Sequence, residues 1–319
     1  MTEQPSHAEI PAEFAGQRFD QILPRLFRGY SRAHLAGEVK AGRIRLDHRE
    51  TLPRTLIRGG EAVDWEQVET AVLGDRPESI ALDVVYEDAD LLVVNKPPGL
   101  VVHPGAGNHT GTLLNALLNH DPRLAQIPRA GIVHRLDKDT SGLLVVARSL
   151  PAQTALVAML AARDIHRRYA AVVNGVPVAG GTVDAPLDRH PTDRIRRAVR
   201  EGGRPAVTHY RVREKFRAQA LLQCVLESGR THQIRVHMAH VGYPLVGDPL
   251  YGRGLKLPRG ATAELDAALR GFRRQALHAE HLAFTHPLSG AVLAFDAEPP
   301  ADFRALLAAL RVDAAAADG

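Results

Sequence analysis

The amino-acid sequence predicts an α+β protein with a mixed, largely antiparallel sheet, preceded by a small ααβ module. Three observations favour this class. From Ile80 onward, strand-like runs mostly follow one another through short turns with helical segments inserted, an order typical of α+β domains rather than of doubly wound parallel sheets. Residues 16–65 instead show two helical patterns followed by short alternating runs. The length of 319 residues, 45% of them hydrophobic and 24% charged, is ordinary for a folded protein of about two domains.

The N-terminal part divides into a tail and a module. Residues 1–15 are polar, hold two prolines and show no periodicity, so we expect a disordered tail. The run RFDQILPRLF then has apolar residues at helical spacing, and SRAHLAGEVKAG follows with Gly42 as a stop. The next segment alternates like short strands, with a turn signal at Asp47 and His48. Residues 16–65 are therefore predicted to form a compact ααβ module.

The rest of the chain reads as a linker, a large domain and a second tail. Residues 66–79 carry no period and end in Asp-Arg-Pro-Glu-Ser, which is typical of a linker. The large domain is predicted over residues 80–310. Its opening run, IALDVVYEDADLLVVNKPPGLVVHPG, gives strands and turns, and GTLLNALLNH and PAQTALVAMLAARD give two helices. The closing residues 311–319, RVDAAAADG, are predicted to be a frayed tail.

Composition excludes several classes of protein. No apolar stretch approaches ~18 residues, so no membrane span is expected. The N-terminus lacks the basic start and apolar run of a secretory signal. The single cysteine, Cys224, cannot support a disulfide framework or a cysteine-based zinc site. Together these features predict a cytoplasmic location.

Basic residues gather in two segments of the chain. The net charge is +4 overall, but residues 16–65 carry +4 and residues 189–217 carry +7. The remainder is therefore acidic. Two basic patches on such a chain favour binding to a polyanion, and solvated surface charge is the alternative.

A dense polar cluster lies in GIVHRLDKDTSGLLVV, residues 131–146. Four charged and two hydroxyl side chains stand between two apolar runs that are predicted to be strands, and packed cores do not hold such groups without reason. An aspartate near Arg135 and Lys138 can be kept ionised and act as a nucleophile or a base. The alternative is an Asx-turn with surface charges.

Other clusters suggest chemistries that the pattern does not support. The run HYRVREKFRAQALLQCVLESGRTHQIRVHMAHVGYP is predicted to form strands and a turn, with a short helix at its end as an alternative. In an extended strand Arg235 and His237 would share a face. His232, His237 and His240 could suggest metal ligands, but without cysteines or an H-E-x-x-H pattern we expect no metal. The loop HPGAGNHTGT lacks the Lys-Ser/Thr pair of a nucleotide-phosphate loop. The Asp-Thr-Ser-Gly run beginning at Asp139 has no second copy, which a single-chain aspartic protease needs.

Several motifs, in order, resemble those of the RluA-type pseudouridine synthases. HRLDKDTSGLLVVA is similar to the family signature, and RRYAAVV and GRTHQIRVHMAHVGYPLVGDPLYG match the next two motifs. VVNKPPGLVVHPGAGN matches the stretch that precedes the signature. The resemblance covers nearly all of residues 80–300, and residues 16–65 resemble an S4 RNA-binding domain, although IRLDHRE replaces its common Val-Asn-Gly turn.

The resemblance implies the pseudouridine synthase fold and an isomerase that converts uridine to pseudouridine in 23S ribosomal RNA, in the loop of helix 69. It implies ribosomal RNA as partner, no cofactor, no metal, no membrane and a monomer. Asp137 matches the essential aspartate, Tyr169 the tyrosine that packs on the target uracil, and Arg235 the arginine that pairs with the aspartate. Arg135 matches the arginine that fills the space left by the flipped base. The further expected substrate or RNA contacts are His134, Arg230, His232, Arg32 and Arg43.

Two other classes of function remain open at this stage. A non-catalytic RNA-binding factor for ribosome assembly would have the same fold, and we would expect a substitution at Asp137, Tyr169 or Arg235, which are all intact. A different aspartate-dependent hydrolase, such as a glycosidase, needs a second carboxylate as acid/base partner, and the sequence offers no clear one.

Overall fold

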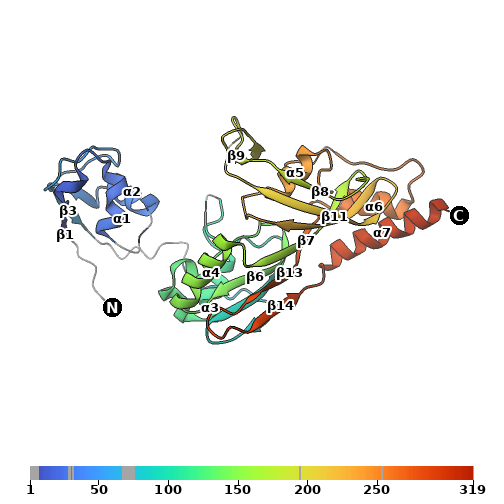
Figure 1. Cartoon of the computed structure of the whole chain (residues 1–319), viewed down its shortest axis with the longest axis horizontal. Coiled ribbons are helices and arrows are strands. Elements are labelled where there is room, and N and C mark those ends of the chain that lie inside the picture. The colour runs from blue at the N-terminus through green and yellow to red at the C-terminus, as the bar shows by residue number, and fades with distance from the viewer. Residues whose placement is uncertain are drawn as a thin grey trace. The chain divides into compact units, whose positions relative to one another are not determined.

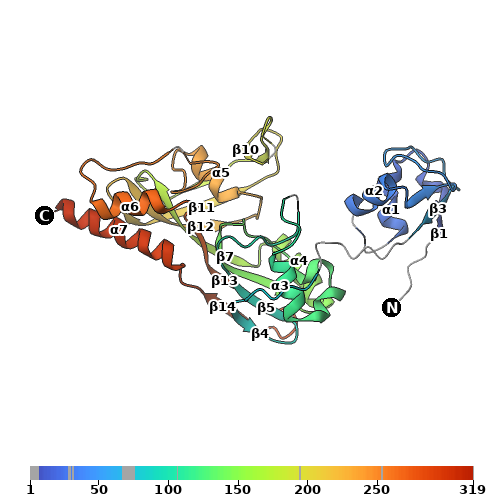
Figure 2. The same cartoon turned by 180° about the vertical axis from the view of Figure 1, so that it is seen from behind.

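The chain forms two compact units, Met1–Ala71 and Val72–Gly319, which Figures 1 and 2 show from opposite sides. The unit boundary falls inside the predicted linker, of which residues 67–75 lie outside the described part of the chain. The computed structural model describes residues 7–27, 30, 32–66, 76–105, 107–193, 195–252 and 254–318.

In its described residues the first unit has two α-helices and a three-stranded antiparallel sheet of order β1-β3-β2. Its elements are β1 (His7–Glu9), the 3₁₀ helix η1 (Ala12–Phe14), α1 (Phe19–Leu26), α2 (Arg32–Lys40), β2 (Ile44–Leu46) and β3 (Ala62–Trp65). Both helices and strands β2 and β3 contribute buried apolar side chains to one core. The predicted turn after β2 is present: Asp47 and His48 have φ of 48° and 61°, as the two central residues of a type I′ hairpin turn require.

The predicted disorder of residues 1–15 is wrong from His7 onward. Strand β1 pairs with β3, and Ile10, which follows it, is fully buried. The partner strand lies far along the chain, and a polar edge strand shows no periodicity of its own. Its order therefore depends on backbone hydrogen bonds that local sequence does not reveal.

The described part of the second unit is built on a nine-stranded sheet of order β4-β5-β6-β13-β7-β12-β11-β8, with β14 beside β13. The strands are β4 (Val84–Glu87), β5 (Leu91–Lys96), β6 (Ser141–Ala147), β7 (His166–Asn174), β8 (Gly181–Asp184), β11 (Val207–Lys215), β12 (Gln219–Leu226), β13 (Leu277–Thr285) and β14 (Val292–Asp296). Strands β6 and β13 run parallel and the other neighbours antiparallel. This confirms the predicted mixed, largely antiparallel sheet. A separate hairpin joins β9 (Leu187–Arg189) to β10 (Arg197–Val199).

Helices cover both faces of this sheet. Helices α3 (Leu113–His120) and α5 (Gln233–His240) share a core with one face, and α4 (Leu150–Ala162), α6 (Ala263–Gly271) and α7 (Ala301–Asp318) pack on the other. Two 3₁₀ helices, η2 (Pro122–Gln126) and η3 (Pro128–Gly131), follow α3. Side chains alternate along β7, so Tyr169 belongs to the α3 and α5 face and Ala170 to the opposite one. The first of these faces carries the polar groups described below.

Two local predictions in this unit are wrong. Residues 311–319 are not a frayed tail, because α7 continues to Asp318. Alanine is the strongest helix former, and the buried Asp313 fastens the last turns by accepting hydrogen bonds from Arg217 and from the Thr262 N–H. Residues 131–133 do not form a strand either; only Ile132 makes an isolated bridge, to Val146.

Candidate active site

Asp137 lies on the connection that leads into strand β6. Its backbone carbonyl accepts the Thr140 N–H at 3.0 Å, which closes a tight turn, and the carbonyl of Lys138 accepts the Gly99 N–H at 3.0 Å. Only 14% of the Asp137 side-chain surface is exposed. The predicted cluster is therefore a backbone-anchored loop that presents one carboxylate at the edge of a cleft.

Lys96, at the end of β5, stabilises this loop through hydrogen bonds to backbone carbonyls. Its side chain is 1% exposed, and its ammonium group donates hydrogen bonds to the carbonyls of Pro97, Leu100 and Lys138 at 2.8 to 2.9 Å. Burial lowers the pKa of Lys96 to about 7, opposed by the charges of Asp139 and Asp137. The sequence shows NKPPG without revealing this role, because the three acceptors are backbone groups.

Arg235 connects two carboxylates. Its Nη1 donates to Asp137 Oδ2 at 3.1 Å, and its Nε and Nη2 donate to the two oxygens of Asp248 at 2.7 and 2.9 Å. Burial opposes the charge of Arg235, but the hydrogen bonds and charges of both aspartates keep its pKa above the ordinary value. Asp248 also accepts the backbone N–H groups of Leu250 and Tyr251. This bidentate arrangement aims Arg235 at Asp137.

Of the two alternatives for this segment, an extended strand and a short helix at its end, the structure has the helix, because residues 233–240 form α5. His237 consequently does not share the surroundings of Arg235. It is fully buried, and its ring nitrogens hydrogen-bond to Thr208 and to the Ala185 carbonyl. A short helix of mixed polarity has no clear amphipathic period, so the local pattern could not distinguish a helix from a strand here.

His232 faces Asp137 from the start of α5. Its Nε2 lies 3.9 Å from Asp137 Oδ1, and its Nδ1 lies 2.8 Å from the Tyr251 hydroxyl, which accepts the Arg197 N–H at 2.7 Å. Burial lowers the pKa of His232, opposed by the charge of Asp137. If the Tyr251 hydroxyl donates to Nδ1, the proton of the neutral ring lies on Nε2, facing the carboxylate.

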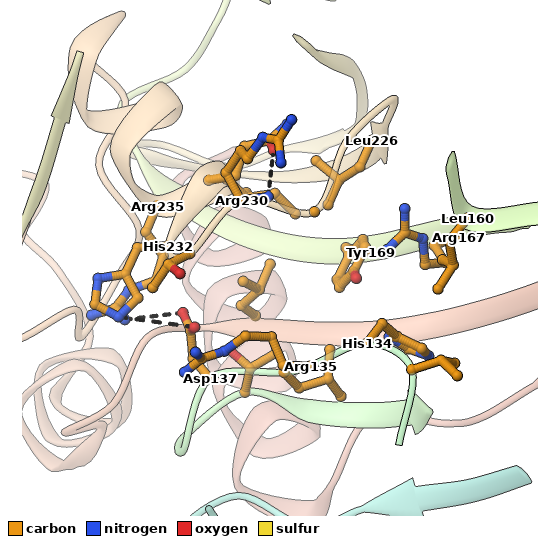
Figure 3. A pocket seen from close by; sticks show the side chains of 18 of the residues that line it. His134, Arg135, Asp137, Leu160, Arg167, Tyr169, Leu226, Arg230, His232 and Arg235 are labelled. Carbon is orange, nitrogen blue, oxygen red and sulfur yellow. Dashed lines mark hydrogen bonds and ion pairs between the residues drawn. The ribbon is translucent and has the colours of Figure 1, made fainter. Parts of the chain in front are cut away.

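These groups open on a cleft of about 770 Å³ (Figure 3). Tyr169, which is 5% exposed, lies along its wall on β7, and burial raises the pKa of its phenol. Asp137 is the one acidic residue among the described residues that line the cleft. The arginines that line it are Arg129, Arg135, Arg167, Arg204, Arg230 and Arg235. This excess of positive charge suits an anionic ligand.

Most of the residues singled out in the sequence converge here. The cleft is lined by Asp137, Tyr169, Arg235, Arg135, His134, Arg230 and His232. Arg32 and Arg43 lie in the first unit, where they pair with Asp20 at 2.9 Å and with Glu38 at 2.7 Å. The residues that sequence reasoning missed are Lys96, Arg167, Asp248 and Tyr251.

Two further observations concern the described residues only. No group of three or more His, Cys, Asp or Glu side chains there is arranged to hold a metal ion. No helix in that part of the chain is long and apolar enough to cross a membrane.

Comparison with known proteins reveals the family. The family model described as RNA pseudouridylate synthase matches residues 90–240, the segment that contains Asp137, Tyr169 and Arg235. The chain is 59% identical over 310 residues to a ribosomal large subunit pseudouridine synthase D of Xanthomonas campestris, covering 97% of this chain and 94% of that one. It is 51% identical to the Pseudomonas aeruginosa protein of the same name, with 96% of both chains covered. The motif order and the N-terminal module predict likeness to this member of the family, and these matches confirm it.

Solved structures agree with the sequence relatives. Human RNA pseudouridylate synthase domain containing 4 matches with a TM-score of 0.56 and 25% identity, over 72% of this chain and 92% of that one. Human RNA pseudouridylate synthase domain containing 1 matches with a TM-score of 0.53 and 25% identity, over 70% and 85%. The chain therefore belongs to the RluA-type family of RNA pseudouridine synthases, which are isomerases, as its sequence motifs predict.

Proposed function

We propose that the protein isomerises uridine to pseudouridine in 23S ribosomal RNA, at uridines in the loop of helix 69, and that Asp137 is the catalytic residue. The observation that carries this proposal is the ion pair of Asp137 with Arg235, in a cleft that, among the described residues, Tyr169 and five further arginines also line. The names of the close relatives support large-subunit ribosomal RNA as substrate. Ribosomal RNA as substrate in turn favours action in the cytoplasm.

The reaction requires one carboxylate that acts as a nucleophile or as a base. The bond from N1 of uracil to the ribose C1′ breaks, the base rotates, a bond forms from C5 to C1′, and the proton leaves C5 while N1 gains one. Asp137, paired with Arg235 at 3.1 Å, attacks the sugar or removes a proton from it. Tyr169 packs on the uracil and is placed for the proton transfer at C5. No group is lost and no electrons are exchanged with another molecule, so the chemistry needs no cofactor.

An enzyme can reach the target uracil only after this base has left the stacked bases of the RNA. Flipping costs a few kcal/mol and less in a loop, which favours a hairpin-loop uridine. The exposed Arg135, two residues before Asp137 at the cleft, is placed to fill the vacated space. The first unit, as an S4-like domain, adds phosphate contacts through residues such as Arg32 and Arg43, whose paired guanidinium groups retain further N–H donors.

The substrate assignment is tested by mapping pseudouridines. We expect ribosomal RNA from cells that lack the gene to lose pseudouridine at positions in the helix 69 loop, and plasmid-borne wild-type protein to restore them. The same cells expressing Asp137→Asn protein serve as the control and should stay unmodified. An unchanged map of the large-subunit RNA would refute the proposal and favour a non-catalytic assembly factor.

The cleft histidines predict the pH dependence. Burial lowers the pKa of His103 to about 4 and of His134 to about 3, and it lowers that of His232. A lowered pKa means that each ring stays neutral to a lower pH than a free histidine does. Single-turnover rates at saturating RNA should therefore show no histidine titration between about pH 7 and 9. A rate limb with a midpoint near 7 that vanishes in His232→Gln would contradict this.

A further inference from the structure

Arg167 lines the same cleft as Tyr169 and lies at the end of it that is away from the Asp137–Arg235 pair. The two residues stand at alternate positions of β7, so both side chains point to the same face of the sheet. Figure 3 shows Arg167 beside His134 and Leu160, with Tyr169 between this group and the Asp137–Arg235 pair. Two residues along a strand span about 7 Å, a distance that a single nucleotide can bridge.

The Arg167 side chain is largely buried and has no counter-charge among the described residues. The residue is 8% exposed, and among the described residues it makes no ion pair, while its buried Nε has no hydrogen-bond partner. A Cβ on Gly229 would lie 3.1 Å from its Nη1, so loop backbone packs closely against it. An isolated buried charge is unfavourable in a folded protein, and such a group is typical of a site that receives its partner from a ligand.

His134 places a second unpartnered donor at the same end of the cleft. Its Nε2 accepts the Val145 N–H at 3.1 Å. Burial and the charge of Arg167 lower the pKa of His134 to about 3, so the ring is neutral. Its proton therefore lies on Nδ1, which is buried and has no hydrogen-bond partner. Two donor groups, the charged Arg167 guanidinium and the neutral His134 ring, therefore have unpartnered N–H groups among the described residues.

We propose that Arg167 and His134 form a phosphate subsite that binds the RNA backbone next to the flipped uridine, an inference that rests on the proposed function. A full positive charge without a carboxylate calls for an anion rather than for a neutral carbonyl, and a guanidinium matches phosphate geometry. Anchoring this phosphate sets the position of the base on Tyr169 relative to Asp137. The subsite thereby determines which nucleotide of the bound RNA lies next to Asp137.

The test compares Arg167→Met with Arg168→Met. Arg168 is the neighbouring residue on β7; it points to the other face, is 42% exposed and lies 3.6 Å from Asp296. Arg167→Met should weaken binding of a helix 69 hairpin by about ten- to hundredfold. It should also make the slope of log affinity against log salt shallower by about 0.7 to 0.9. Arg168→Met should leave affinity and slope within error.

Two more measurements separate a phosphate contact from a structural role. Arg167→Lys, which retains the charge, should keep the wild-type salt slope, and Arg167→Met should melt no lower than the wild type, because an uncompensated buried charge is removed. Hairpins with one neutral methylphosphonate beside the target uridine should bind the wild type more weakly, with no further loss in Arg167→Met at that position. Additive losses at every position, or a weaker affinity with an unchanged slope, would overturn the phosphate subsite.

The outcome is distinguishable from failure of the proposed function. If Arg167→Met binds and reacts as the wild type while Asp137→Asn is inactive, the subsite is wrong and the synthase assignment stands. If the wild type itself forms no pseudouridine in the hairpin or in whole 23S RNA, the proposed function fails first.

Discussion

Asp137→Asn is expected to reduce uridine isomerisation by about 10⁴-fold or more while leaving RNA affinity within about tenfold. An amide of the same shape cannot act as nucleophile or base, and it removes the negative charge that Arg235 faces at 3.1 Å. Affinity should persist because the other arginines that line the cleft, which we propose to contact phosphates, are unchanged. Single-turnover assays at saturating RNA, together with equilibrium binding of the same RNA, measure the two effects separately.

Asp139→Asn is the matched control for this prediction. Asp139 lies two residues further along the same loop, and its backbone carbonyl accepts a hydrogen bond from Arg274, which the substitution leaves in place. Asp139→Asn should therefore keep substantial activity. An active Asp137→Asn protein, or an inactive Asp139→Asn protein with normal folding, would show that the catalytic carboxylate has been misassigned.

Arg235→Met should damage both stability and catalysis. It leaves Asp137 and the buried Asp248 without their cation, and breaking a buried pair by removing one partner costs about 3–5 kcal/mol. The isomerisation rate should fall by about 10²–10³-fold, since the charge that pairs with Asp137 and orients it is lost. Chemical denaturation and single-turnover rates are the measurements.

A double variant distinguishes the two effects of that substitution. Asp248→Leu, combined with Arg235→Met, replaces one of the two carboxylates that have lost their cation by an apolar side chain. The free energy of unfolding should therefore recover in part. The isomerisation rate should not recover, because Asp137 still lacks its partner. A double variant that regains the wild-type rate would mean that Arg235 matters for folding alone.

Local sequence revealed those features that depend on neighbouring residues. Alternating and continuous apolar runs predicted the strands and the antiparallel character of the sheet, since strand periodicity is local. The polar cluster around Asp137 stood out because charges are costly between buried runs. The same reasoning failed at β1 and at the end of α7, where pairing with distant residues or a single buried Asp313 decides the structure, and it left strand and helix open at α5.

The fold class and the family could be predicted from the sequence alone, and its motifs singled out Asp137, Tyr169 and Arg235 as candidate site residues. Which partners those residues have is visible only in the folded chain. Arg235 meets Asp137 across 98 residues of chain and Lys96 reaches the Lys138 carbonyl across 42. The physical reason is that pairing and burial of charges depend on distances through space. That Arg167 has no ion pair among the described residues became visible only when strand β7 placed it near Tyr169, because the presence or absence of a partner is a property of the folded cleft.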